Sequence, residues 1–483
     1  MLSIKVADLN KLYINGEWVQ AESGESIDVI NPATGEVVSP VPKAGKKEAR
    51  LAVDAAHEAF KSWSQTTSYE RSALLKKWHD LLLENKEEVA SILVEEQGKP
   101  LSEALAEVNY AASFLSWYAE EAKRIYGETV PASFQDKRIL LIKQPAGVVA
   151  AITPWNFPAA MITRKVAPAL AAGCTAVIKP AELTPLTAIK LAELAEKAGI
   201  PKGVFNVITG DAQQIGQTWL QDERVAKITF TGSTEVGKLL MRGAADTVKK
   251  VSLELGGHAP VIVFGDADLD KAVSGVIGSK FRNCGQTCVC ANRIYVEKSI
   301  LPKFTAKLKE EVAKIKVGFG YEPDAEIGPL INEAAYTKVK KHIDDAVEKG
   351  AVIEHGGNRI NEYSNGYFFE PTILSGVHEE MVIMQEETFG PVAPIIEFTS
   401  IEEVIEKANS SRYGLAAYAF TESLKTAITA YEKLEFGIVG INDGVPSTAQ
   451  APFGGLKESG LGREGGHHGL DEFLEVKYVS IKL

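Results

Sequence analysis

Apolar residues of this chain first recur at helical spacing and then gather in short runs that alternate with helices. Residues 50–126 place apolar side chains three and four positions apart, most clearly in SALLKKWHDLLLENKEEVASILVEEQ. The runs that follow are GVVAAITPW, TAVIKP, VFNVITG, AKITFTG and KKVSLELGG. Between them lie helical segments such as TPLTAIKLAELAEKAG, in which Thr184 and Pro185 are the predicted cap and first turn. The alternation predicts βαβ units, a parallel sheet, and a nucleotide crevice at the carboxyl ends of its strands.

A second series of the same kind begins near residue 257. It runs through APVIVF, NRIYVE, the helical LPKFTAKLKEEVAKIKVG and AVIEHGG. No internal repeat, low-complexity tract or linker separates the two series. We therefore expect two α/β domains that pack closely against each other.

Composition narrows the class of protein and its partners. At 483 residues, with 45% hydrophobic and 24% charged positions, the chain can bury a large core, exceeds one ordinary domain and needs no disulfides. We expect a cytoplasmic protein with reduced thiols, because the first thirty residues lack a signal-peptide pattern and no run of about 18 apolar residues occurs. The net charge of −12, without a cluster of Lys and Arg, disfavours nucleic acid and membranes. A small molecule is the expected partner.

Three of the four cysteines lie together in FRNCGQTCVCANR, residues 281–293. The fourth, Cys174, lies in the apolar run ALAAGCTAVIKP and is predicted to pack in the core. The spacing C-x3-C-x-C differs from the paired C-x2-C of structural zinc sites, and the closest histidine, His258, is thirty residues from Cys288. We therefore expect no metal site.

Cys288 is the member of this cluster that fits core packing least well. Its neighbours Gly285, Gln286 and Thr287 are turn and polar residues rather than strand core. The surroundings of Cys288 therefore leave two interpretations open, a small packed thiol or a reactive nucleophile.

Polar residues at the ends of the strand-like runs are the other candidates for a site. In ITFTGSTEVG, the Gly232-Ser233 turn opens a helix, which either holds a phosphate or is ordinary helix capping. Glu254 stands just before two glycines in KKVSLELGG, as a functional or simply a solvated carboxylate. Asn156 lies between prolines in ITPWNFP, where it either presents a rigid amide or forms a turn.

Seven stretches, in chain order, resemble the aldehyde dehydrogenase superfamily over the whole length of the chain. They are ITPWNFP, VIKPAELTP, ITFTGST, LELGG, FRNCGQTCVCANR, EETFGP and PFGGLKESGLGREGG. Within the superfamily the chain is most similar to the succinate-semialdehyde dehydrogenases, through AMITRK, SKFRNCGQTCVCANR and SGLGREGGHHGLDEFLEVKY. One departure is His258 after LELGG, where Asn or Lys is more usual; it lies beyond the glycines and leaves the catalytic assignments unchanged.

The resemblance implies an α/β fold of the aldehyde dehydrogenase type, with two doubly wound Rossmann-like domains and a small β arm for oligomerisation. Residues 1–126 and 146–256 would form the NAD-binding domain, and residues 257–456 the catalytic domain. Residues 127–145 and 457–483 would form the oligomerisation arm and the C-terminal segment. The alternating terminus LEVKYVSIKL exposes a pairing edge, so a homodimer or homotetramer is expected.

The resemblance also assigns the catalytic residues. Cys288 would be the nucleophile, because a thiolate adds to an aldehyde to give a thiohemiacetal whose hydride can pass to a nicotinamide ring. The amide of Asn156 and the backbone N–H of Cys288 would stabilise the oxyanion, a contribution of roughly 3 kcal/mol per donor. Glu254 would be the general base for the water that hydrolyses the thioester.

The coenzyme-binding residues follow from the same resemblance. They are Trp155, Lys179, Glu182, Gly232, Ser233, Glu387 and Phe389. Lys179 and Glu182 would face the adenosine ribose, where the carboxylate accepts hydrogen bonds from NAD and repels the 2′-phosphate of NADP. We therefore expect NAD in preference to NADP, although Glu182 could instead cap the following helix.

The resemblance places Arg164, Arg282 and Ser447 at the distal end of the substrate. Arginine can bind a carboxylate bidentately, which favours succinate semialdehyde; the alternative is that these arginines form surface or interdomain salt bridges. Glutarate semialdehyde is the second candidate and a broad range of aldehydes the third, because one methylene changes binding by only about 1–3 kcal/mol.

Cys290 lies two residues beyond the nucleophile and is a possible redox partner for it. Alternate residues of an extended chain lie about 6–7 Å apart, so a strained, easily reduced Cys288–Cys290 disulfide is possible, and passive packing of Cys290 is the alternative.

Two other classes of protein share some of these features. A cysteine-dependent acyl hydrolase would need a histidine base, and none of the eight histidines lies in a matching motif. A non-catalytic structural relative would have lost the set Cys288, Glu254 and Asn156, which this chain retains. Both are remote alternatives to the dehydrogenase.

Overall fold

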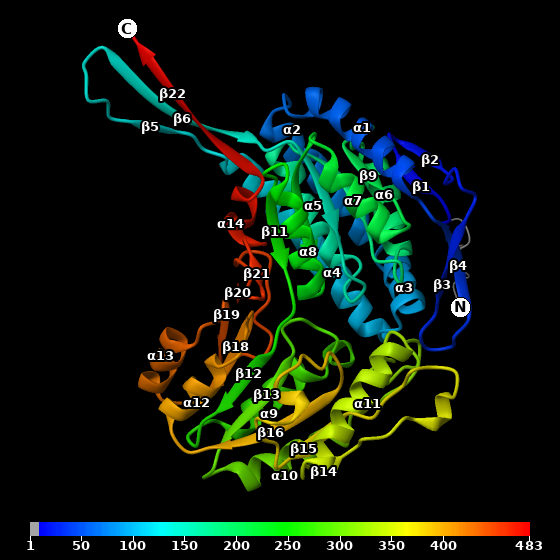
Figure 1. Ribbon diagram of the computed structural model, residues 1–483, viewed down its shortest axis with the longest axis vertical. Coiled ribbons are helices and arrows are strands. Elements are labelled where there is room, and N and C mark those ends of the chain that lie inside the picture. Colours follow the sequence, from blue (N-terminus) through cyan, green and yellow to red (C-terminus); the bar gives the residue numbers. More distant parts are fainter. Residues whose placement is uncertain (1–8) are drawn as a thin grey trace.

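The computed structural model describes residues 9–483 and arranges them as two helix-covered sheets and a projecting arm (Figure 1). The first sheet has the strand order β2-β1-β9-β8-β7-β10-β11-β21. Its strands are β1 Leu12–Ile14, β2 Glu17–Val19, β7 Val148–Ile152, β8 Thr175–Lys179, β9 Phe205–Val207, β10 Val225–Thr231, β11 Lys250–Glu254 and β21 Gly460–Leu461. The five strands from β9 to β11 in this order are parallel, as the apolar runs predicted.

Helices cover both faces of the first sheet, because alternate residues of its strands point to opposite sides. Val149 and Ala151 of β7 pack in one core with the layer that includes α2, α4, α5 and α6, and Val148 and Ala150 pack in another with α1 and α7. The helices are α1 Lys46–Trp63, α2 Ser68–Glu84, α3 Lys86–Gln97, α4 Leu101–Glu121, α5 Ala160–Ala172, α6 Leu186–Ala198, α7 Ala212–Gln221 and α8 Thr234–Ala245. Both faces of the central strands are therefore buried.

The predicted cap of α6 is wrong. The side chain of Thr184 does not cap the helix and donates to the carbonyl of Trp155 instead (3.3 Å). The backbone N–H groups of Leu186 and Thr187 donate to the carboxyl group of Glu96, which lies 90 residues earlier on α3. A carboxyl group is a stronger acceptor at a helix N-terminus than a hydroxyl, and only the tertiary fold brings it there.

The second sheet has the order β14-β15-β16-β13-β12-β18-β19 and is parallel except for the pair β14 and β15. Its strands are β12 Ala259–Val263, β13 Ala291–Glu297, β14 Val352–His355, β15 Thr372–Ser375, β16 Val392–Phe398, β18 Ala416–Phe420 and β19 Ile438–Ile441. Its helices are α9 Leu269–Lys280, α10 Leu301–Val312, α11 Glu333–Glu348, α12 Ile401–Asn409 and α13 Leu424–Lys433. The helix predicted from LPKFTAKLKEEVAKIKVG thus ends at Val312.

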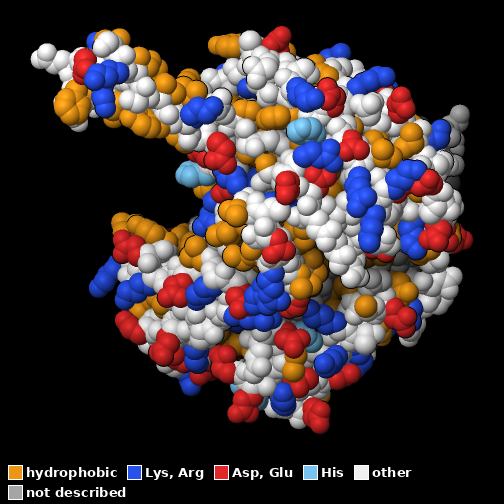
Figure 2. All heavy atoms as spheres, turned by 45° about the horizontal axis from the view of Figure 1, so that its top comes forward, with side chains coloured by type: hydrophobic (Ala, Val, Ile, Leu, Met, Phe, Trp, Pro, Cys, Tyr) orange, Lys and Arg blue, Asp and Glu red, His pale blue; other side chains and the backbone are white. Residues whose placement is uncertain are grey.

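The arm consists of β5 Glu128–Val130, β6 Lys137–Pro145 and β22 Leu474–Lys482, which form an antiparallel sheet away from both domains (Figure 1). Hydrophobic side chains show along it in Figure 2, and Val476 and Tyr478 are 63% and 60% exposed. The rest of the C-terminal segment lies elsewhere: β21 pairs with β11, and α14 Gly466–Asp471 contacts α4 and α5. Only β22 of residues 457–483 therefore belongs to the arm.

Smaller strand pairs complete the fold. The strands β3 Ser26–Ile30 and β4 Val37–Pro42 form a hairpin, and β17 Tyr413–Gly414 pairs with β20 Leu456–Lys457. Within residues 9–483, no helix combines the length and the apolar character needed to cross a membrane. The same residues contain no cluster of three His, Cys, Asp or Glu side chains arranged to hold a metal ion.

Candidate active site

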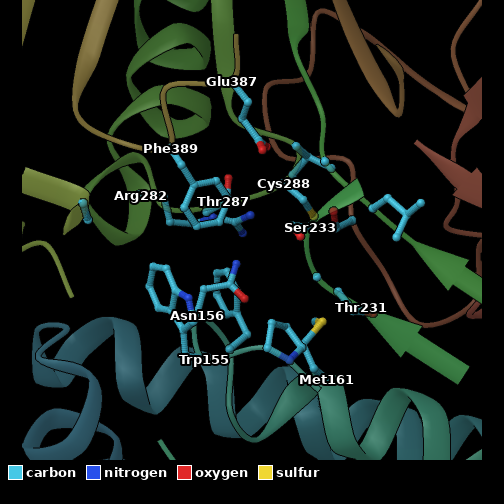
Figure 3. A pocket seen from close by; sticks show the side chains of 18 of the residues that line it. Trp155, Asn156, Met161, Thr231, Ser233, Arg282, Thr287, Cys288, Glu387 and Phe389 are labelled. Carbon is cyan, nitrogen blue, oxygen red and sulfur yellow. The ribbon is translucent and has the colours of Figure 1, made fainter. Parts of the chain in front are cut away.

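A cavity of about 410 Å³ lies where the carboxyl ends of β7 and β10 meet loops of the second domain. Most of the predicted site residues line it, namely Trp155, Asn156, Arg164, Gly232, Ser233, Arg282, Cys288, Glu387, Phe389 and Ser447. Figure 3 shows Asn156 and Trp155 on one side, with Arg282, Thr287 and Cys288 opposite. Glu254, Lys179, Glu182 and Cys290 do not line the cavity. A cavity of this size suits a small-molecule substrate with part of a coenzyme.

Cys288 lies on the loop between the short helix η3 Arg282–Gly285 and β13, and its side chain is half-buried. The loop reaches the cavity through two consecutive left-handed residues, Asn283 (φ 52°) and Cys284 (φ 58°). Gly257 of LELGG lets the loop approach, because a Cβ there would lie 2.1 Å from the carbonyl oxygen of Cys288. Burial raises the pKa of the Cys288 thiol to about 12, and the guanidinium of Arg164 opposes that effect. Reaction at this thiol therefore needs a nearby proton acceptor.

Asn156 follows β7 and presents its amide to the cavity from a buried position. Its Nδ2 donates to the backbone carbonyl of Gln286 (3.0 Å), two residues before Cys288. An amide nitrogen carries two hydrogens, so one N–H is used to join the loops and the other is available to an oxyanion.

Glu254 ends β11 and is 2% exposed, beside the cavity rather than in its wall. Its Oε2 has no hydrogen-bond partner in the described part of the chain, and a Cβ at Gly454 would lie 3.0 Å from its Oε1. Burial raises the pKa of Glu254 well above its usual value, and the carboxylate of Glu464 raises it further. The protonated and ionised forms of Glu254 are thus closer in free energy than those of a solvated carboxyl group.

Glu464 is a buried residue that the sequence analysis did not single out. It pairs with the ammonium group of Lys165, which also donates to Thr231 Oγ1 (2.7 Å), and with Arg164 Nε at 2.5 Å. The available signal was its position between Arg463 and two glycines in GLGREGG, a charged residue in a tight glycine-rich segment. Four ionisable side chains, those of Arg164, Lys165, Glu254 and Glu464, therefore share one buried cluster.

The two predicted substrate arginines have different surroundings. Arg164 lines the cavity but pairs with Glu464, so the salt-bridge alternative applies to its Nε. Its Nη2 has no hydrogen-bond partner among the residues that the structure describes. Arg282 lines the cavity with its guanidinium 5.5 Å from the ring centre of Phe157, and it pairs with no carboxylate of residues 9–483. Tyr110, which the sequence analysis missed, lines the same cavity from α4.

Residues that suit a dinucleotide lie at the carboxyl ends of β8 and β10. Lys179 Nζ pairs with Glu182 Oε1 at 2.7 Å. Glu182 therefore does not cap α6, and Glu96 caps that helix instead. Ser233 caps α8, since its Oγ accepts from the backbone of Val236 (3.3 Å). A helix N-terminus suits a pyrophosphate, and a carboxylate suits ribose hydroxyls.

Glu387 and the aromatic pair Trp155 and Phe389 border the cavity near Cys288. Glu387 Oε1 accepts from the backbone N–H of Gly257 (3.0 Å), and burial raises the pKa of Glu387 to about 7. The rings of Trp155 and Phe389 pack edge to face, with centres 5.6 Å apart. These donors, carboxylates and flat apolar walls fit a nicotinamide coenzyme.

The remaining cysteines and His258 lie outside the cavity. Cys290 is completely buried, its thiol donates to the carbonyl of Lys280 (3.5 Å), and burial raises its pKa. Cys174 is buried in the core, as predicted. The buried imidazole of His258 lies 3.0 Å from the carbonyl oxygen of Met384.

The fold, with a cavity that brings a cysteine together with residues suited to a nicotinamide coenzyme, fits one class of protein, the α/β oxidoreductases. The aldehyde dehydrogenase family model matches residues 18–479. The chain therefore belongs to the aldehyde dehydrogenase family and is an NAD(P)-dependent aldehyde dehydrogenase. The resemblance inferred from the seven sequence stretches and the α/β fold that it implied are both confirmed.

Individual relatives are similar over nearly the whole chain. A mitochondrial succinate-semialdehyde dehydrogenase of Oryza sativa is 56% identical over 467 residues, which cover 96% of this chain and 88% of the relative. A glutarate-semialdehyde dehydrogenase of Pseudomonas putida is 53% identical over 484 residues, 100% of both chains. The crystal structure of an Escherichia coli NADP-dependent enzyme has 53% sequence identity and a TM-score of 0.97, covering 99% of each chain. Relatives of similar identity thus differ in the substrate for which they are named, and one of them is named for NADP.

Proposed function

We propose that the enzyme oxidises succinate semialdehyde to succinate with NAD. The observation that carries this proposal is the guanidinium of Arg282, which lines the cavity beside Cys288 without a carboxylate partner in residues 9–483. A cation in a largely apolar cavity favours a substrate that brings its own negative charge. Arg164 Nη2, which has no partner within the described chain, and the hydroxyl of Ser447 supply further donors for a distal carboxylate.

The nucleophilic half of the reaction uses Cys288 and Asn156. The thiol gives up its proton to a solvent water molecule in the cavity, and Cys288 Sγ forms a bond to the aldehyde carbon while the carbonyl π electrons move to oxygen. The free N–H of the Asn156 amide and the backbone N–H of Cys288 stabilise that oxyanion. Because these donors are held in place before the substrate arrives, they need little reorganisation during the reaction.

The hydrolytic half uses Glu254. When bound, the coenzyme supplies the acceptor for the hydride that leaves the former aldehyde carbon. Glu254 then takes a proton from the attacking water, whose oxygen adds to the thioester carbon. The C–S bond breaks and releases the acid from Cys288. Since Glu254 does not line the cavity as it stands, its side chain must rotate toward Cys288 to reach this water.

A substrate panel tests the proposal. We expect catalytic efficiency to fall in the order succinate semialdehyde, glutarate semialdehyde, butanal. Arg282→Ala should lower efficiency with succinate semialdehyde by about 10- to 100-fold, the effect of a lost charged hydrogen bond, and leave butanal nearly unchanged. Arg282→Lys is the matched control, since it keeps the charge but loses the planar fork. Its efficiency with succinate semialdehyde should lie between those of the wild type and Arg282→Ala. An unchanged preference in Arg282→Ala would refute the assignment.

Glutarate semialdehyde is the second candidate, favoured by the identity to the Pseudomonas putida relative. The two substrates differ by one methylene, which changes transition-state binding by only about 1–3 kcal/mol. A higher kcat/KM for the five-carbon aldehyde would replace the first candidate while retaining the role of Arg282.

The preference for NAD rests on Glu182, because its carboxylate would repel a 2′-phosphate. The Escherichia coli relative is named for NADP, so the test must be direct. In Glu182→Ser, the charge is removed and the ammonium of Lys179 is released from its ion pair, which should raise NADP efficiency relative to NAD. Glu182→Asp keeps the charge and should retain the wild-type ratio. A wild type that prefers NADP would contradict the proposal.

The arm is proposed to join copies of the chain into a homodimer or homotetramer. Its three strands have no covering layer in the described chain and expose Val476 and Tyr478. Exposed edges with apolar side chains favour pairing with another chain. Light scattering should show an oligomer that Val476→Lys with Tyr478→Lys weakens. The cytoplasmic location remains a prediction, since the Oryza relative is named as mitochondrial.

A further inference from the structure

Asn283 is the centre of a buried hydrogen-bond network that joins the two loops of the site. Its Nδ2 donates to the carbonyl of Asn156 (3.0 Å) and to the carbonyl of Gln286 (3.2 Å). Its Oδ1 accepts from Gln97 Nε2 (3.0 Å), and its backbone N–H donates to the carboxyl group of Glu103 (2.9 Å). Asn283 is 3% exposed, so these bonds form without competition from bulk water.

The carbonyl of Asn156 receives a second donor from Lys99. Lys99 Nζ lies 2.9 Å from that oxygen, and its charge is balanced by Glu107, with both side chains 1% exposed. Glu107 in turn accepts from the backbone N–H of Ala159 (2.9 Å), at the start of α5. Lys99 and Asn283 therefore both donate hydrogen bonds to the backbone carbonyl of Asn156 and fix its position.

We infer that Asn283, supported by Gln97 and Lys99, is a positioning residue for the oxyanion site. Its single amide nitrogen bridges the carbonyl of Asn156 and the carbonyl of Gln286, and the Asn156 side chain donates to that same Gln286 carbonyl. The three bonds close a ring that sets the amide of Asn156 against the loop of Cys288. The inference rests on the proposed role of Asn156 as an oxyanion donor.

The backbone conformation explains why an asparagine suits this position. Asn283 and Cys284 both have left-handed φ values. Asparagine adopts this conformation more readily than most residues, whereas cysteine has no such preference. Two adjacent residues other than glycine keep a left-handed conformation only where surrounding contacts hold them. The network supplies those contacts, and the resulting loop delivers Cys288 to the oxyanion donor in a fixed orientation.

Asn283→Gly is the variant that separates the side chain from the backbone, because glycine adopts the left-handed conformation without strain. The rate of reduced-nicotinamide formation in a single turnover should fall by about 100-fold, as expected for a shift of about 1 Å at a reacting centre. KM for the aldehyde should change far less, since the oxyanion forms after substrate binding.

Cys284→Gly is the matched control. It places glycine at the adjacent left-handed residue, whose buried side chain belongs to the hydrophobic core and to none of these hydrogen bonds. Its single-turnover rate should stay within a few-fold of wild type after its folding has been checked by thermal unfolding. Equal losses in the two variants would mean that the loop conformation alone matters, and would overturn the inference.

A double-mutant cycle with Asn156→Ala distinguishes the inference from the function on which it rests. Asn156→Ala alone should slow the single turnover, and no loss there would refute the oxyanion assignment itself. If Asn283 acts through Asn156, Asn283→Gly should cost little more in the Asn156→Ala background. Fully additive losses would show that Asn283 acts independently of Asn156 and would refute only the inference.

Gln97→Met provides a second variant if Asn283→Gly folds poorly. It keeps the length of the side chain but removes the donor to Asn283 Oδ1, and Gln97 lies on α3 outside the cavity wall. We expect a smaller fall in the single-turnover rate, about tenfold, again with little change in KM. A folded Gln97→Met enzyme with the wild-type rate would count against the network.

Discussion

Two groups of buried side chains beside the active site differ in their hydrogen bonding. On the nucleophile side, the side chains of Asn283, Gln97 and Gln286 have partners for their buried polar atoms and carry no charge. On the base side, Glu254 Oε2 and Arg164 Nη2 are buried without a partner from residues 9–483, in a cluster that also contains Lys165 and Glu464.

This difference matches the two halves of the proposed reaction. Addition of the thiolate needs donors at a fixed position, which the hydrogen-bonded side chains of Asn283, Gln97 and Gln286 help to maintain. Hydrolysis needs a group that moves and exchanges a proton, which a carboxyl group with an unpartnered oxygen and a raised pKa can do. We interpret the nucleophile side as preorganised and the base side as adjustable.

The largest expected effect comes from removing the proposed nucleophile. Cys288→Ala should reduce turnover by at least about 10⁴-fold, because no other group on that side can form the covalent intermediate. Steady-state formation of reduced nicotinamide measures this, with Cys284→Ala as the control that keeps the nucleophile. Turnover of Cys288→Ala near the wild-type rate would contradict the role of Cys288 as the nucleophile.

Removing the proposed base, Glu254, should stop hydrolysis while leaving the first half of the reaction, up to hydride transfer, intact. Glu254→Gln should still produce one equivalent of reduced nicotinamide per site, while steady-state turnover falls by about 10²- to 10⁴-fold. The wild-type kcat should rise with pH through the raised pKa of Glu254, because the protonated carboxyl cannot accept a proton from water. Glu254→Gln should remove that rise. Loss of the single-turnover burst would place Glu254 on the nucleophile side as well.

Glu464→Gln should change the base side by a smaller amount. The Glu464 carboxylate raises the pKa of Glu254, so its neutralisation should shift the rising limb of kcat to lower pH. The positive charges of Lys165 and Arg164 remain in this variant and also lower the pKa of Glu254, because both favour its ionised form. The rate of the single turnover should change little at neutral pH. A limb that moved to higher pH would contradict this reading of the cluster.

The smallest expected effect concerns Cys290. Peroxide should inactivate the wild type, and dithiothreitol should restore it if Cys290 traps oxidised Cys288 as a disulfide. Because the buried Cys290 thiol points to the carbonyl of Lys280, the loop must rearrange first, so the reaction should be slow. Recovery should be poorer in Cys290→Ala. Equal recovery of both forms would leave Cys290 with a packing role only.

Much of the fold was predictable because it depends on local patterns. The apolar runs around Val149, Ile178 and Ile262 became buried parallel strands, since a strand covered on both faces must be apolar along its whole length. The cap of α6 was not predictable, because Glu96 reaches Leu186 across 90 residues. A local hydroxyl such as Thr184 is the only cap that a sequence pattern can suggest.

The sequence by itself determined the family and the positions where chemistry is possible, because a nucleophile, an amide and a carboxyl group at strand ends leave local signatures in FRNCGQTC, PWNFP and LELGG. Only the tertiary structure decided which partners these groups have. It pairs Arg164 with Glu464, leaves Arg282 without a carboxylate partner among residues 9–483, and joins Asn283 to Gln97 across 186 residues. Hydrogen bonds and ion pairs act over a few ångströms in space, whatever the distance along the chain, so such pairings exist only once the chain has folded.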